Sequence, residues 1–109
     1  MIKINFSIKK ITIGSTDFDI IWDKKTSSGS FSYPDKKKAF IKIGVEDHKI
    51  NPLRTFEIII HELKEIIQLE QSTRYGRADE ARNYEFHYTH KEHTDLCSRL
   101  AELLNKFIK

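Results

Sequence analysis

The chain has 109 residues, 39% of them hydrophobic and 32% charged, with a formal net charge of +3 and a pI near 9.0. This balance is typical of one folded domain spanning residues 1–109, and it excludes a disordered or membrane-embedded chain. No apolar run approaches the roughly 20 residues that a membrane-spanning helix needs, and residues 1–10 alternate instead of forming a signal-peptide core. We therefore expect a cytoplasmic protein without a membrane partner. Its one cysteine, Cys97, excludes an internal disulfide and a structural zinc site built on cysteine pairs.

The first 45 residues carry the alternation of apolar and polar side chains that is typical of half-buried strands. Residues 2–8 alternate, and Ile11 and Ile13 continue the alternation after a one-residue shift that indicates a bulge near residues 9–10. A second strand is expected around residues 17–22, a loop at residues 26–30 (TSSGS), and a further strand at residues 39–45. These segments predict a small, mostly antiparallel sheet.

Two long helices are expected after the sheet. Asn51 and Pro52 form a helix start, and apolar residues recur with helical spacing from there to about Ser72. The last helix is expected from His90 to about Phe107, with Thr89 as its cap. Its predicted buried stripe consists of Leu96, Leu100, Leu103, Leu104 and Phe107, with Cys97 as a small core residue.

The segment between the two helices gives a weaker signal. A short helix around residues 78–82 and an extended stretch at residues 84–88 are expected there, and His48 is interpreted as a loop histidine. The predicted fold class is α+β: a small sheet followed by two long helices.

The stretch that points to chemistry is residues 58–67, which reads IIIHELKEII. On a helix, His61 and Glu65 share one face and Glu62 lies beside them, which is a spacing suited to a metal ion. A helix that simply carries one surface histidine and two solvated glutamates is the alternative interpretation. Near so apolar a helix, however, an uncompensated carboxylate or imidazole costs several kcal/mol, and a bound cation would compensate it.

A second group of histidines lies at positions 87, 90 and 93. If the two helices pack together, His90 can meet His61 and Glu65, and two imidazoles with one carboxylate leave coordination positions open, as in a catalytic zinc site. Glu62, turned about 100° around the helix, is placed to take a proton from the water that zinc activates and to act as general base. A hydrogen-bond donor to a developing oxyanion is also expected, and the sequence leaves open which residue supplies it: Tyr75, Tyr84, Tyr88, His87 or His93.

At the level of IIIHELKEII and the order of elements over roughly residues 39–104, the chain resembles the small single-domain zincin metalloproteases, including the ImmA/IrrE and SprT types and short phage-encoded relatives. In zincins the motif is HExxH. His61 and Glu62 match it, and Glu65 stands where the second histidine belongs. The resemblance implies a minimal zincin-like fold, a peptide or protein substrate, zinc as cofactor and Glu62 as general base, with His61, Glu65 and His90 as ligands. The departure at Glu65 leaves open an active variant site, a site for another divalent ion, or a degenerate zincin that binds a partner.

Three functions follow from these observations. The leading hypothesis is a zinc-dependent hydrolase, a peptidase of a phage or other mobile element. The second is a non-catalytic, zincin-like metal-binding interaction protein. The third, a small basic nucleic-acid-binding module, is disfavoured because the lysine runs at residues 9–10, 24–25 and 36–38 are dispersed and lie at expected strand ends or turns.

Overall fold

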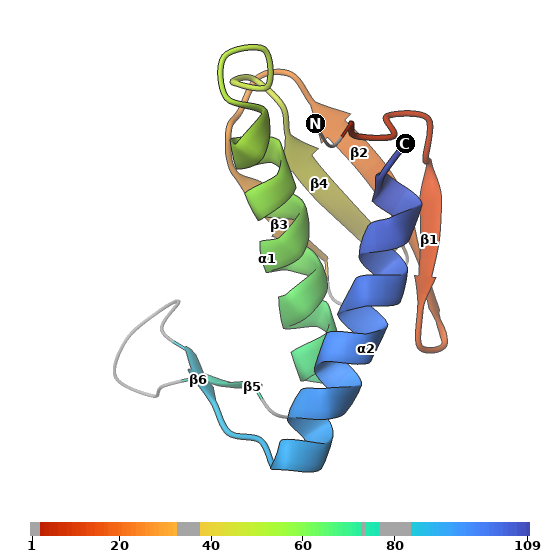
Figure 1. Cartoon of the computed structure of the whole chain (residues 1–109), viewed down its shortest axis with the longest axis vertical. Helices are drawn as coiled ribbons and strands as arrows, with labels where there is room; N and C mark the ends of the chain where they lie inside the picture. Colours follow the sequence, from red (N-terminus) through yellow and green to blue (C-terminus); the bar gives the residue numbers. More distant parts are fainter. Residues whose placement is uncertain (1–2, 33–37, 73, 77–83) are drawn as a thin grey trace.

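A four-stranded sheet covered on one face by two long helices makes up the protein (Figure 1). The structure is a computed structural model, and it describes residues 3–32, 38–72, 74–76 and 84–109. The strands of the sheet are β1 (Lys10–Ile13), β2 (Thr16–Asp23), β3 (Gly29–Phe31) and β4 (Phe40–Gly44), and the helices are α1 (Pro52–Glu70) and α2 (His90–Phe107). A separate two-stranded ribbon joins β5 (Arg74–Gly76) to β6 (Tyr84–Phe86). The predicted α+β class is confirmed.

The sheet has the strand order β1-β2-β4-β3 and is mixed. β1 pairs antiparallel with β2, and β3 pairs antiparallel with β4, whereas the two central strands β2 and β4 are parallel. Ile20 lies opposite Ile41, and Trp22 lies opposite Ile43. Antiparallel pairs therefore predominate, as the sequence predicts, and β3 lies at an edge of the sheet.

The N-terminal segment departs from the prediction. The alternation at residues 2–8 predicts a strand of the sheet, but among the described residues 3–8 only Ile4 makes a strand-like bridge, and it pairs with Ile108 after α2. The backbone N–H of Asn5 also donates to the carbonyl of Phe107 at 2.8 Å. Residues 3–8 form no strand of the sheet because backbone bonds of this segment go to the end of α2, and β1 begins at Lys10.

The predicted loop at residues 26–30 is correct only in its first half, because β3 begins at Gly29. Thr26 and Ser28 already bond to the end of β4 and the residues beyond it: the carbonyl of Ser28 accepts from Gly44 at 2.9 Å, and that of Thr26 accepts from Glu46 at 3.0 Å. A serine- and glycine-rich stretch has no periodicity from which a strand can be predicted. Here pairing with β4 overrides the local signal.

α1 provides most of the helical part of the core. Ile59, Leu63 and Ile67 are fully buried between the sheet and α2. The predicted start is confirmed at Pro52, with Asn51 in the cap position, although the Asn51 side chain makes no capping hydrogen bond. In the described ranges, no helix is both long and apolar enough to cross a membrane.

α2 buries Leu96, Leu103 and Phe107, while Leu100 and Leu104 are half-buried at the core. Cys97, predicted to be a core residue, is exposed. One residue along a helix rotates the side chain by about 100°, so the position after Leu96 lies outside the buried stripe. The extended conformation predicted near residues 84–88 is confirmed for β6, and the short helix predicted at residues 78–82 lies outside the described residues.

The capping box at the start of α2 is present as predicted. The Thr89 side chain accepts from the backbone N–H of Glu92 at 3.2 Å, and the Glu92 carboxylate accepts from the backbone N–H of Thr89 at 2.9 Å. Replacing Thr89 with Ala removes one of these bonds and is expected to lower the free energy of unfolding by about 1 kcal/mol, measured by urea unfolding. The matched control is Thr94→Ala, because the Thr94 hydroxyl donates back to the carbonyl of His90 within the helix and caps neither end. Equal losses in the two variants would contradict a specific capping role.

Candidate functional site

A cleft lies between α1 and the edge strand β3, with a volume of about 300 Å³. Its lining combines the start of β3 with one side of the first half of α1: Ser28, Gly29, Arg54, Glu57, Ile58, His61 and Glu62. Positions 54, 57, 58 and 61 recur at helical spacing, so the turns of α1 present them in succession to the cleft. Both His61 and Glu62 of the HExxE motif therefore line the cleft.

Glu62 is buried, with 5% of its surface exposed, and packs beneath β3. A Cβ atom at Gly29 would lie 3.0 Å from Oε1 of Glu62 and 2.5 Å from Cγ2 of Ile58. The second of these distances is too short for a real contact, so a side chain at position 29 would force Ile58 or the strand to shift. Gly29 thus allows the strand backbone to approach α1 closely at the carboxylate of Glu62.

His61 and Glu65 form the pair that the motif predicts. Nε2 of His61 lies 3.0 Å from Oε2 of Glu65, one helical turn further on. The histidine side chain is 69% exposed, whereas that of the glutamate is only 14% exposed. An exposed imidazole beside a largely covered carboxylate can accept a proton or bind a cation from the solvent side.

The structure does not bring His90 to this pair. The two helices run antiparallel, and their contacts fix the register: Nε2 of Gln71 donates to the carbonyl of Glu92 at 2.9 Å, and Arg99 pairs with Glu70. His90 therefore begins α2 at the end of the molecule where α1 ends (Figure 1). α1 rises about 13 Å between His61 and Glu70, so the expected contact between His61 and His90 is not made.

Among residues 3–32, 38–72, 74–76 and 84–109, no three histidine, cysteine, aspartate or glutamate residues form a group able to hold a metal ion. Of the predicted ligands, His61 and Glu65 lie together, and His90 is separate. The metal site with these three ligands stays a prediction, of which the structure assembles two members.

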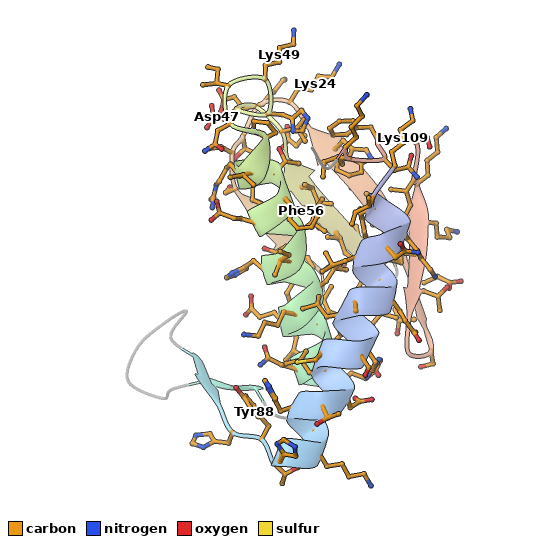
Figure 2. The ribbon with its side chains drawn as sticks, in the orientation of Figure 1. Lys24, Asp47, Lys49, Phe56, Tyr88 and Lys109 are labelled. Atoms are coloured by element: carbon orange, nitrogen blue, oxygen red, sulfur yellow. The ribbon has the colours of Figure 1, made fainter. Side chains whose placement is uncertain are left out.

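None of the candidate oxyanion donors whose side chains the structure describes lies in the cleft. Tyr88 stacks on His93 at the start of α2, and His87 is exposed in the segment before it. Figure 2 shows Tyr88 at that end of the molecule, beyond the C-terminal end of α1. The side chains of Tyr75 and Tyr84 lie outside the described part of the structure. His48 is a loop residue as predicted, and its Nδ1 lies 2.8 Å from the Thr55 hydroxyl.

Arg54 and Glu57 line the cleft but were not predicted from the sequence. They precede His61 by seven and four residues. The helical spacing that relates His61 to Glu65 therefore could have predicted that both lie on the same face of the helix as His61. Arg54 is held in place by its Nε, which donates to the carbonyl of Ser27 at 3.0 Å. It is a fixed cation in the cleft, and it can contact a carboxylate or carbonyl oxygen of a ligand.

We compared the chain with known proteins. No protein-family model, no curated protein and no solved structure matches it.

Proposed function

We propose that the protein is a metal-dependent hydrolase, a peptidase whose active site is the cleft between α1 and β3. The observation that carries the proposal is that both residues of the HE pair, His61 and Glu62, line this cleft, with the Glu65 carboxylate 3.0 Å from His61. The likeness of HExxE to the zincin motif supports the same assignment.

The donor types fit zinc. An imidazole nitrogen from His61 and a carboxylate oxygen from Glu65 are both common zinc ligands. Catalytic zinc usually has three protein ligands, and the described residues near the pair supply two, so we assign only His61 and Glu65. A zinc ion held there would supply Lewis acidity, which polarises a substrate carbonyl and acidifies water.

Glu62 is the residue we assign to proton transfer. It belongs to the lining of the cleft, and its side chain is largely covered and lies against the backbone of Gly29. A carboxylate fixed in this way can accept a proton from water in the cleft and deliver it to the leaving amine. Because packing restricts its rotamers, little reorganisation is needed for this transfer.

An extended peptide is the substrate that suits the cleft. One wall is the edge strand β3, in which Ser30 is exposed. Edge strands offer backbone groups to which an extended peptide can add as a further strand. A peptide that added along β3 would pass over the mouth of the cleft, next to Arg54 and His61.

Zinc content tests the metal part of the proposal. In a Cys97→Ser background, which removes the only thiol, the purified chain is expected to bind one zinc ion, measured by equilibrium titration and elemental analysis. Adding His61→Ala should weaken zinc binding by more than about 100-fold, because changes to outer-shell partners alone cost 10–100-fold. The matched control is His87→Ala, an exposed histidine away from the cleft lining, which should leave zinc binding unchanged. A chain that binds no zinc, or binds it equally well without His61, contradicts the proposal.

A second candidate function is a non-catalytic peptide-binding protein that uses the same cleft. The observation in its favour is that the described residues bring together two metal ligands and not three. It predicts that peptides bind the chain without being cleaved, and that chelation of divalent metals leaves their affinity unchanged. Cleavage that requires His61 would exclude it.

A further inference from the structure

A second set of metal-binding side chains lies on α2, outside the cleft. Sγ of Cys97 is 3.7 Å from Nε2 of His93, one helical turn before it, and both side chains are exposed. Neither residue belongs to the lining of the cleft, and neither contributes to the buried stripe of α2. The pair therefore has no role in the core or in the proposed active site.

The separation of the two atoms suits a metal ion. Zinc binds imidazole nitrogen at about 2.0–2.1 Å and thiolate sulfur at about 2.3 Å, so two such ligands at a tetrahedral angle stand about 3.6 Å apart. The observed 3.7 Å between Nε2 and Sγ is close to this value. A cation could enter between the atoms with little movement of either side chain.

The imidazole is also held in position. The ring of Tyr88 stacks on that of His93, with 5.6 Å between ring centroids and 14° between ring planes. Tyr88 directly precedes Thr89, whose capping box fixes the first turn of α2. The stack restricts the motion of the His93 ring, which lowers the entropy lost when a metal binds.

We infer that His93 and Cys97 form a two-ligand chelate for Zn²⁺ or a metal ion of similar preference. A thiolate with an imidazole favours zinc and related transition metals over magnesium or calcium, which prefer oxygen ligands. The metal replaces the proton of the Cys97 thiol, which is released to solvent. No third histidine, cysteine, aspartate or glutamate among the described residues completes the group, so water occupies the remaining coordination positions.

Cobalt is the probe that separates this site from the cleft. Co²⁺ bound by a thiolate gives a ligand-to-metal charge-transfer absorption, which a site made of His61 and Glu65 cannot produce because it holds no sulfur. Titrating the full-length, phosphine-reduced chain with Co²⁺ should produce this absorption, and added Zn²⁺ should abolish it. The absorption should be lost in Cys97→Ser, and half-saturation in His93→Ala should need more than about tenfold more cobalt. It should persist in His61→Ala, so failure of the proposed hydrolase would leave this result intact.

Two further variants test the geometry. His90→Ala should leave the cobalt affinity unchanged, because His90 is not part of the pair. Tyr88→Ala should weaken it by about threefold to tenfold, the range expected for loss of one ring-stacking contact. The absence of a charge-transfer absorption would overturn the inference. An unchanged cobalt affinity in His93→Ala would also overturn it, because a surface thiol alone would then account for the binding. Circular dichroism of each variant checks that α2 is retained.

Discussion

Replacing Glu62 with Gln is expected to reduce peptide hydrolysis by about 10²–10⁴-fold, the usual contribution of a positioned general base. Gln has nearly the same shape as Glu, so it keeps the packing against Gly29 while losing the ability to accept a proton at neutral pH. Zinc binding should be retained, because the proposed ligands are His61 and Glu65. The measurement is kcat/KM on peptides found by mass spectrometry of a digested denatured protein, with zinc content determined on the same sample.

The matched control is Glu57→Gln. Glu57 lies in the same cleft and carries the same charge, but its side chain is exposed and one turn before His61. Its loss should change kcat/KM far less than the loss of Glu62. If Glu62→Gln binds zinc and cleaves peptides as fast as the unaltered chain, Glu62 is not the base. If both variants lose activity equally, the effect belongs to the charge of the cleft and not to a positioned carboxylate.

The helices could be predicted closely from the sequence because their signals are local. Pro52 starts α1, and the Thr89 capping box starts α2 at the predicted residue. Both signals act within one turn of helix and require no knowledge of the rest of the fold. The same holds for the pairing of His61 with Glu65, which follows from helical spacing alone.

Features that depend on distant parts of the chain could not be predicted in this way. The parallel pairing of β2 with β4, and the position of β3 at the edge, depend on the path of the chain between strands. The alternation at residues 2–8 is compatible with a strand, yet Ile4 in this segment pairs with Ile108 at the end of α2, more than 100 residues away. Side-chain alternation predicts which residues of a strand share a face, but not which segment of the chain pairs with that strand.

The expected contact between His61 and His90 is an instance of the same limit. Sequence spacing puts each histidine on a known turn of its helix, but their separation depends on how far one helix is shifted along the other. Gln71 and Glu70 set that shift through Glu92 and Arg99, which are polar contacts at one end of the pair. The cleft itself depends on Gly29, whose missing side chain gives no sequence signal for a neighbour on α1.

Among the substitutions proposed for this chain, the largest effect on stability is expected at Phe107, at the end of α2. Its ring is fully buried and lies edge-on to Trp22, with 6.1 Å between ring centroids. Its carbonyl also accepts from the backbone N–H of Asn5, so the N-terminal segment, β2 and α2 meet at this residue. Phe107→Ala should lower the free energy of unfolding by about 3–5 kcal/mol, because burial is lost and a cavity is left. Since small domains have only about 5–15 kcal/mol of stability, this variant should be close to unfolding at 37 °C.

Phe6→Ala is the matched control, because Phe6 makes the same kind of contact with Trp22 without being buried. Its ring lies edge-on to Trp22 with 4.9 Å between centroids, yet the residue is 43% exposed. If burial at the junction of the termini holds α2 on the sheet, Phe6→Ala should cost about 1 kcal/mol, mainly the aromatic contact. Urea unfolding followed by Trp22 fluorescence measures both variants, since Trp22 is the only tryptophan and contacts both rings. Equal losses would mean that the contact with Trp22, and not the burial of Phe107, stabilises this end of the domain.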